Sequence, residues 1–196
     1  VGLLLGPAGA RHEEQVRVGA DGVGFRAWRL DPDRSGARDI GGQLDRERRV
    51  NSWNDNLAAA RVLSGAGVPA TYFITSGYVD RDSMLTTGQL RQLAALPGVE
   101  IGAHSVSHPY LDELDGNQLA REVRESRQWL RGALGHEIAT FAYPHGAHGP
   151  RVRQAVIDGG FSAAAAVKNA VSHAGDDVFA VARWTVTAEH GVDDIR

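Results

Sequence analysis

The sequence has no cysteine among its 196 residues. This absence excludes disulfide bridges, thiolate metal ligands and cysteine nucleophiles, so any metal site must use histidine and carboxylate side chains. Long hydrophobic runs are also missing. The apolar stretch at the start, VGLLLGPAGA, has no basic region before it and is much shorter than the roughly 20 residues needed to cross a bilayer. We therefore expect no membrane span in this chain, and the residues themselves show no export signal.

An excess of positive charge is missing as well. Lysine and arginine total 21 against 24 acidic residues, which gives a formal net charge of -3. This balance argues against nucleic acid or an anionic membrane surface as the main partner and fits a neutral or small-molecule substrate. Because 42% of the residues are hydrophobic, the chain is long and apolar enough to bury one sizeable core.

From Asn51 onward, short apolar runs alternate with segments of helical period, a pattern typical of a parallel α/β fold. Helices are expected from Asp55 or Asn56 through Leu63, from Thr86 or Thr87 to a stop at Pro97-Gly98, from about Gly116 to Leu134, and from Pro150 to an end at Gly159-Gly160. Strands are expected at Val68 to Thr75, Val99 to Ala103, and in the runs IATFAY, FSAAAAV and VARWTV.

Residues 1–50 form an atypical segment, distinct from the domain expected at 51–196. They are rich in glycine and arginine, alternate like a strand only around Val23 to Leu30, and show no βα unit. One stretch follows the order of an EF-hand calcium loop, at Asp31, Asp33, Ser35, Gly36 and Asp39. The closing glutamate of such a loop would fall on Gly42, so a polar turn is the favoured interpretation.

The stretch EIGAHSVSHPYL carries the clearest chemical signal. His104 and His108 lie four residues apart, just beyond the carboxyl end of an expected strand. Two imidazoles at this spacing can share one face of a turn and bind Zn²⁺ together with a third ligand and a water. The carboxyl ends of strands are also where βα barrels place their active sites. An exposed or core-satisfied histidine pair is the alternative for this spacing alone.

From about Asp55 to Val186 the chain resembles the polysaccharide deacetylase family, also called the NodB-homology domain or carbohydrate esterase family four. GVPATYFIT resembles the family's Ala-Thr-Phe-Phe strand, and GAHSVSHPYL matches its His-Ser-x-x-His metal motif. FAYPHGAHG resembles the third motif in the branch that has Phe-Ala-Tyr-Pro-Tyr-Gly, with His145 in place of a tyrosine. VARWTV resembles that branch's terminal strand and puts Arg183 at its usual arginine.

This resemblance implies a distorted (β/α) barrel, incomplete at the N-terminus in one interpretation, that removes N-acetyl groups from a carbohydrate. It implies a divalent metal, usually zinc, with His104 and His108 as ligands that help to polarise the acetyl carbonyl and activate water. The backbone N–H of His145 would hold the oxyanion. Ser105 would support the metal turn, Tyr143 and Pro144 would shape the sugar groove, and Arg183 would belong to the substrate site.

The first family motif, Thr-Phe-Asp-Asp-Gly, which supplies the general base and a metal aspartate, is not found. Counting back from Ala70 by the usual spacing reaches Arg49, Val50 and Asn51 instead. Asp45 lies too early and Asp55 too late, and Asp55 is expected to be a helix N-cap. His190 lacks the pattern around the family's late general-acid histidine. The third metal ligand and the general base therefore stay unassigned.

Three alternatives follow for function. The chain is an N-deacetylase acting on an N-acetylated glycan, or an impaired domain of the same fold that only binds glycan, or an incomplete fragment. His145 and His148 flank Gly146. Each is either an extra ligand or sugar contact, or a solvated loop residue. The resemblance implies a location at the cell envelope or outside the cell.

Overall fold

The computed structural model describes residues 23–24, 53–82, 84–146, 148–167, 172 and 175–183. The strands are β1 (Val23–Gly24), β2 (Ala70–Ile74), β3 (Val99–Ala103), β4 (Thr140–Ala142) and β5 (Ala163–Ala165). The α-helices are α2 (Trp53–Gly65), α3 (Thr87–Ala94), α4 (Gly116–Leu134) and α5 (Pro150–Asp158). Two short 3-10 turns, η1 (Ser76–Tyr78) and η2 (Pro144–Gly146), follow β2 and β4.

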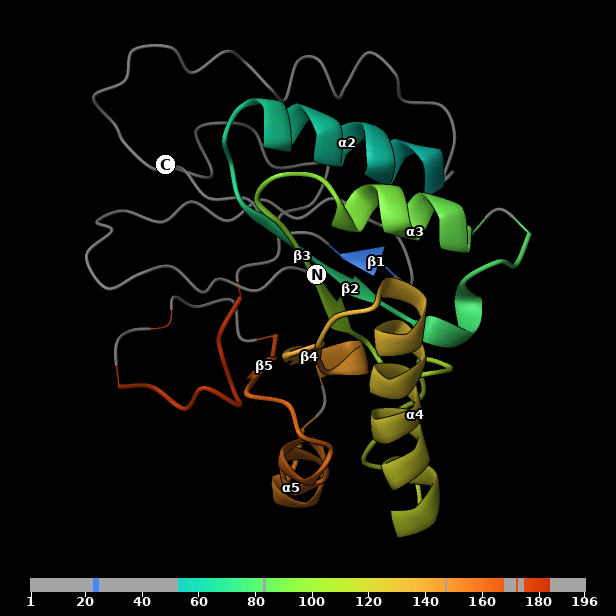
Figure 1. Ribbon diagram of the computed structural model, residues 1–196. Helices are drawn as coiled ribbons and strands as arrows, with labels where there is room; N and C mark the ends of the chain where they lie inside the picture. Colours follow the sequence, from blue (N-terminus) through green and yellow to red (C-terminus); the bar gives the residue numbers. More distant parts are fainter. Residues whose placement is uncertain are drawn as a thin grey trace.

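The strands form one sheet in the order β1-β2-β3-β4-β5. β2, β3, β4 and β5 are parallel, whereas β1 pairs antiparallel with β2. Each parallel pair is joined by a helix, with α3 between β2 and β3, α4 between β3 and β4, and α5 between β4 and β5 (Figure 1). The expected parallel α/β fold is confirmed. The carboxyl ends of β2, β3 and β4 consequently lie at one edge of the sheet.

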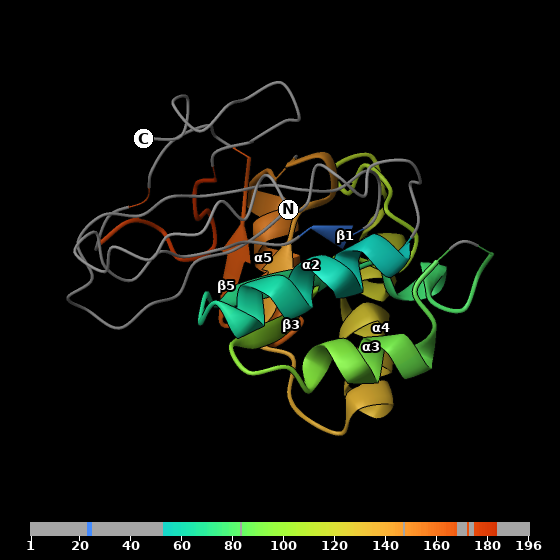
Figure 2. The ribbon, with the colours of Figure 1, turned by 90° about the horizontal axis from the view of Figure 1, so that it is seen from above.

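Alternation along the strands sorts the side chains onto two faces. Tyr72, Ile74, Ile101 and Phe141 belong to the main core, which buries the apolar sides of α2, α3, α4 and α5 against the sheet. The intervening residues form a smaller cluster of buried side chains on the other face: Phe73, Ala142, Ala163, Ala165 and Val181. α2 and α3 run side by side over the main core, as both views show (Figures 1 and 2).

Local sequence signals fix most of the helix ends. Thr86 caps α3 and Asp115 caps α4, each in a capping box in which the third residue of the helix is a glutamine that bonds back to the cap. α4 ends at Gly135, which has a left-handed φ of 76°. α5 begins with Pro150 at its first position. The expected bounds of α4 and β3 are confirmed.

Several expected bounds were wrong. α2 continues past Leu63 to Gly65, α3 ends at Ala94, and β4 and β5 cover only parts of the runs IATFAY and FSAAAAV. α2 begins at Trp53, so Asp55 lies in its first turn and is not the N-cap. Acidic residues are also favourable in a first turn, where the helix dipole is positive, so the sequence signal could not separate the two positions. β2 is shorter than the apolar run from Val68 to Thr75, because pairing with β3 covers only Ala70 to Ile74.

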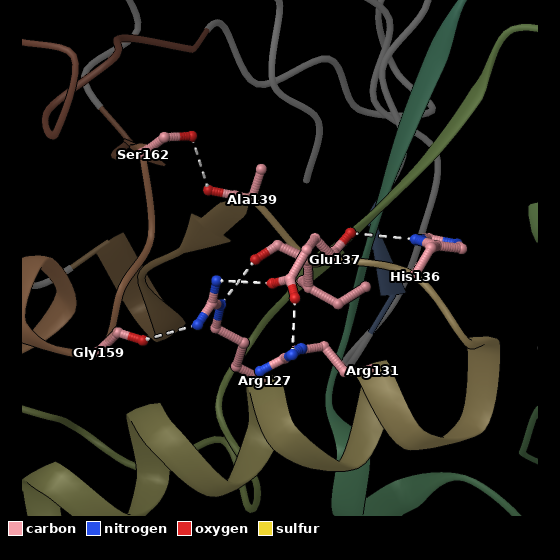
Figure 3. Close-up of polar contacts among 8 residues, drawn as sticks. Arg127, Arg131, His136, Glu137, Ala139, Gly159 and Ser162 are labelled. Carbon is pink, nitrogen blue, oxygen red and sulfur yellow. Dashed lines mark hydrogen bonds and ion pairs between the residues drawn. The ribbon is translucent and has the colours of Figure 1, made fainter.

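The carboxyl end of α4 is fixed to the segment that leads into β4. Glu137 bridges two arginines of the helix, with its carboxylate oxygens 2.9 Å from Arg127 Nη2 and 2.6 Å from Arg131 Nη2 (Figure 3). Arg127 Nε also donates to the carbonyl of Ile138, at 2.9 Å. These contacts link the helix to the approach of β4, whose far end carries the third-motif loop.

Several sequence predictions lie outside the described residues. They are the domain boundary near residue 50, the turn around Asp31 to Asp39, Asp45, the segment 49–51 and His190. Of the last expected strand, the structure describes Val181 to Arg183, and Val181 forms an isolated parallel bridge with Ala165. Within the described part of the chain, no helix is both long and apolar enough to span a membrane.

Candidate metal centre

His104 stands directly after the last residue of β3, at the carboxyl edge of the sheet. Its N–H donates to the carbonyl of Ile74, the last residue of β2, at 2.9 Å. Its side chain is buried, with 4% of its surface exposed. Side chains along a strand alternate between the two faces of the sheet. Residue 104 therefore lies on the same face as Gly102, which is the face of the smaller cluster.

The His104 ring is oriented by the neighbouring strand. Its Nδ1 lies 2.7 Å from the carbonyl oxygen of Ala142, the last residue of β4. A carbonyl only accepts, so Nδ1 carries the proton and Nε2 of the neutral ring carries a lone pair. Burial lowers the pKa of His104 well below its usual value; His108 and Arg183 act in the same direction, against the Ala142 hydrogen bond. His104 is thus held neutral, the form that binds metal.

His108 is brought back toward His104 by a tight loop. Ser105 and His108 both have left-handed backbones, with φ of 64° and 62°. The Ser105 hydroxyl accepts a hydrogen bond from the His108 N–H at 2.9 Å and closes the loop. Left-handed conformations of non-glycine residues cost energy and persist only where surrounding contacts hold them. Hydrogen bonds therefore determine the conformation of this loop more than the backbone preferences of its residues do.

Two neighbouring elements hold the loop. From η1, the N–H groups of Ser76 and Gly77 donate to the carbonyls of Ser105 and Val106, at 3.1 and 2.9 Å. A Cβ on Gly77 would lie 2.6 Å from the Val106 carbonyl oxygen, so only glycine permits this approach. From α4, the carboxylate of Glu122 accepts from Val106 N, Ser107 N and Ser107 Oγ at 2.8, 2.9 and 2.7 Å.

The two imidazoles converge. His104 Nε2 and His108 Nε2 lie 3.1 Å apart, and the rings meet edge to face with centroids 4.7 Å apart. Two nitrogens bound to one tetrahedral zinc ion at its usual bond lengths would be about 3.3 Å apart. The Nδ1 contact of His104 with a carbonyl is the orienting bond that metal-ligating histidines usually make. These two donors fit a divalent metal, although no group of three His, Cys, Asp or Glu side chains able to hold an ion exists among the described residues.

His145 extends the group of rings. Its ring lies edge to face with His108, at 4.5 Å between centroids, and stacks on Tyr110 at 3.9 Å. His145 Nε2 also lies 3.3 Å from the His108 carbonyl. Its backbone φ is 55°, a further left-handed residue at this edge of the sheet. His145 is therefore an exposed loop residue that contacts His108, while His148 stacks on Tyr143 at 4.8 Å.

The remaining expected site residues are buried. Tyr143 donates its hydroxyl to the Phe179 carbonyl at 2.8 Å, and Pro144 is the buried first residue of η2. Arg183 donates from Nε to the Ala166 carbonyl at 2.6 Å and from Nη2 to the Ala165 carbonyl at 3.3 Å. These three residues lie around the third-motif loop and β5. Their roles toward substrate stay predictions, since their described contacts are with the protein itself.

Sequence reasoning missed three contributors. Glu122, Tyr110 and the carbonyl of Ala142 had no assigned role, yet each contacts the histidine loop or His145. Glu122 lies in a helix rich in charged residues, where one carboxylate looks like any other solvated side chain. Only the packing of α4 beside the loop after β3 distinguishes it.

A cavity of about 240 Å³ lies elsewhere, at the opposite edge of the sheet. It is lined by Val99 and Glu100 at the start of β3 and by His136 and Glu137 before β4. Glu100 is itself hydrogen-bonded by Thr71 and Thr140 across the sheet. This cavity contains neither His104 nor His108, so the chemistry of the candidate site does not belong to it.

The comparison with protein families identifies the chain. The family model described as polysaccharide deacetylase matches residues 53–164, which is more than half of the sequence. This chain belongs to the polysaccharide deacetylase family. The matched segment contains β2, β3 and β4 and both histidines of the candidate centre. No curated protein matches the chain.

Solved structures agree on the fold. The deacetylase PplD of Streptococcus pyogenes, solved with acetate, matches with a TM-score of 0.66 and 17% identity over 72% of this chain and 62% of its own. IcaB from Ammonifex degensii matches with a TM-score of 0.60 and 26% identity over 66% of this chain and 61% of IcaB. A CE4 family pseudoenzyme from Bacillus anthracis matches with a TM-score of 0.52 and 20% identity over 59% and 40%. The chain thus spans less than two thirds of the length of these proteins.

Proposed function

We propose that this polysaccharide deacetylase domain is a metal-dependent N-deacetylase that hydrolyses the acetamide of an N-acetylated glycan. Water adds to the acetyl carbon, the carbon–nitrogen bond breaks, and acetate and a free amine leave. The observation that carries the proposal is the convergence of His104 Nε2 and His108 Nε2 at 3.1 Å, at the carboxyl edge of a deacetylase fold.

In this proposal His104 and His108 hold a divalent cation, zinc by preference, and their Nε2 lone pairs are the donors. When bound, such a cation would polarise the acetyl carbonyl and lower the pKa of a water. Ala142 keeps His104 in the required tautomer through its carbonyl, and Ser105 keeps His108 turned toward it. Neutral His104 is ready to bind without first losing a proton.

The third-motif loop supplies the remaining roles. The backbone N–H of His145 would donate to the acetyl oxygen as negative charge develops there. Tyr143 and Pro144 are buried, so they would shape the sugar groove by fixing this loop and not by projecting from it. Arg183 would act on the substrate site in the same indirect way, through the carbonyls of β5 and Ala166. We expect the enzyme to act at the cell envelope or outside the cell, where N-acetylated glycans occur.

A second function is an impaired deacetylase fold that only binds glycan. Two observations favour it: the sequence has Arg49, Val50 and Asn51 where the family's aspartate pair is expected, and the described residues give the histidines no third ligand. The fold similarity to a pseudoenzyme is consistent with this alternative. Loss of a general base alone lowers a rate by about 10²- to 10⁴-fold.

Metal content and acetate release together separate the two functions. Purified protein is analysed for zinc beside His104→Ala and beside His136→Ala, which removes an exposed histidine outside the candidate centre. The proposal expects about one zinc per chain in wild type and His136→Ala and none in His104→Ala. Release of acetate from N-acetylglucosamine oligomers, sensitive to a chelator, then tests the reaction. Absence of zinc from the zinc-supplied wild type would overturn the metal-dependent enzyme, and bound zinc without acetate release would favour the glycan-binding alternative.

A further inference from the structure

We propose that Glu122 is a positioning residue of the metal centre, which holds the loop between His104 and His108 in the conformation that makes their Nε2 atoms converge. The inference rests on the proposed function for the identity of the ion, but its geometric basis is independent of that function. Glu122 lies on α4 and belongs to none of the motifs that define the family resemblance.

The contacts of Glu122 are concentrated on the loop. One carboxylate oxygen accepts from the N–H of Val106 and the N–H of Ser107, at 2.8 and 2.9 Å. The other oxygen accepts from the hydroxyl of Ser107 at 2.7 Å. Hydrogen bonds to an ionised carboxylate are shorter and stronger than those between neutral groups. A single side chain therefore satisfies three donors in the two residues that join Ser105 to His108.

The loop needs such an anchor because its backbone is unfavourable. Ser105 and His108 are both left-handed, and they stand immediately on either side of the two residues that Glu122 holds. Without the carboxylate, the N–H groups of Val106 and Ser107 would turn toward water, and the loop would gain access to ordinary backbone conformations. His108 would then no longer be directed at His104.

The other anchors of the loop do not duplicate this role. η1 holds the carbonyls of Ser105 and Val106 through backbone N–H groups, and the Tyr78 hydroxyl donates to the Ser107 carbonyl at 3.1 Å. These bonds hold carbonyls, whereas Glu122 holds N–H groups. The carboxylate also brings a negative charge to the loop that joins the two imidazoles, which favours a cation over an anion there.

The experiment compares Glu122→Ala and Glu122→Gln with wild type, with Glu125→Ala as the control on the same helix at an exposed position. Zinc affinity is measured by competition with a chromophoric chelator, and the geometry of the centre by the visible spectrum of the cobalt-loaded protein. In metal-free protein, long-range ¹H–¹⁵N NMR records the ring resonances of His104 and His108. Hydrogen exchange measures the exchange rates of the Val106 and Ser107 amides.

We expect Glu122→Ala to bind zinc about 10- to 100-fold more weakly, the range seen when orienting partners of metal ligands are removed. Its cobalt spectrum should change, its His108 resonances should broaden, and the amides of residues 106 and 107 should exchange faster. Glu122→Gln keeps one acceptor oxygen for the two backbone N–H groups and should recover part of the affinity. Glu125→Ala should match wild type.

The outcomes separate the inference from the proposed function. Zinc bound by wild type and by Glu122→Ala with equal affinity and the same cobalt spectrum overturns the inference and leaves the function standing. If wild type binds no zinc, the function falls, and the metal-free rings and amides decide: unchanged signals in Glu122→Ala overturn the inference as well. Should Glu122→Ala not fold, Ser107→Ala removes one of the three bonds, and a several-fold loss of zinc affinity is expected from it.

Discussion

The Nδ1 atom of His104 lies 2.7 Å from the carbonyl oxygen of Ala142, so the histidine that ends β3 is oriented by the last residue of β4. The two residues are 38 positions apart in the chain, with all of α4 between them. Pairing of β3 with β4 at Ala103 and Phe141 brings them together. Sheet register thus decides which nitrogen of the His104 ring carries the proton and which carries the lone pair.

This contact predicts the tautomer of His104. In metal-free protein, Nδ1 should carry the proton and Nε2 should not, and the ring should stay neutral where an ordinary histidine is charged, because burial lowers its pKa. Long-range ¹H–¹⁵N NMR near pH 6 distinguishes the two nitrogens. Zinc should shift mainly the Nε2 signal. The opposite tautomer in the folded protein would contradict the assigned hydrogen bond.

Tyr110 is predicted to contact the sugar. Tyr110 is 51% exposed, and its ring stacks on His145 beside His108, which presents a flat aromatic surface at the site. If the chain is an active deacetylase, Tyr110→Ala should raise KM for N-acetylglucosamine oligomers by about three- to tenfold and change kcat little, the size expected for one stacking contact. Trp129→Ala, which removes an exposed aromatic side chain on α4, is the control and should leave KM unchanged.

Gly102 is predicted to be essential for packing. A Cβ there would lie 2.5 Å from Phe73 Cδ1 and 2.7 Å from Thr140 Oγ1, inside the sheet layer. Gly102→Ala should lower the free energy of unfolding by about 1–3 kcal/mol, as overpacking does. Gly132→Ala is the matched control, because its Cβ meets nothing within 4 Å and α4 should gain up to about 1 kcal/mol. Urea unfolding of both variants gives the comparison, and equal stabilities would refute the steric argument.

Asp80 is predicted to contribute to stability in a pH-dependent way. Its carboxylate accepts from the hydroxyl and the N–H of Thr87, at 2.6 and 2.7 Å, and these bonds lower its pKa below the usual 3.8. The unfolded chain therefore takes up the proton first as pH falls. The stabilisation is present above pH 3.8 and is lost as pH drops through the lower folded pKa.

Asp80→Asn should remove this part of the acid sensitivity. Urea midpoints measured between about pH 5 and pH 2 should fall less steeply in the variant than in wild type. Asp82→Asn, two residues away, is the control and should follow the wild-type curve. Parallel curves for wild type and Asp80→Asn would show that the Asp80 carboxylate contributes nothing to the acid sensitivity of folding.

Arg183 is predicted to contribute mainly to the stability of the fold. Its side chain is 3% exposed and donates to two carbonyls, those of Ala165 and Ala166. Arg183→Met removes these donors. The Ala165 carbonyl keeps its bond from the Tyr143 N–H, whereas the Ala166 carbonyl loses the Arg183 donor, so the free energy of unfolding should fall by about 1–3 kcal/mol. Thermal and urea unfolding measure the loss. A variant of wild-type stability that has a raised KM would instead assign Arg183 to direct substrate contact.

The sequence by itself determined the order of the elements and the chemistry available to them. The period of Leu119, Val123 and Leu130 predicted α4, and the run Val99 to Ala103 predicted β3, because burial of apolar side chains repeats with the period of each element. The absence of cysteine limited any metal site to histidine and carboxylate, and the spacing of His104 and His108 marked the site.

The tertiary structure decided what those histidines face. Parallel pairing placed the Ala142 carbonyl on His104, and the packing of α4 placed Glu122 on the loop before His108. The third-motif loop placed His145 against His108 and against Tyr110. None of these contacts has a signature in the sequence, because each joins residues that are far apart in the chain or differ little from their solvated neighbours. Sheet register and helix packing bring these residues together, and both register and packing depend on the whole core.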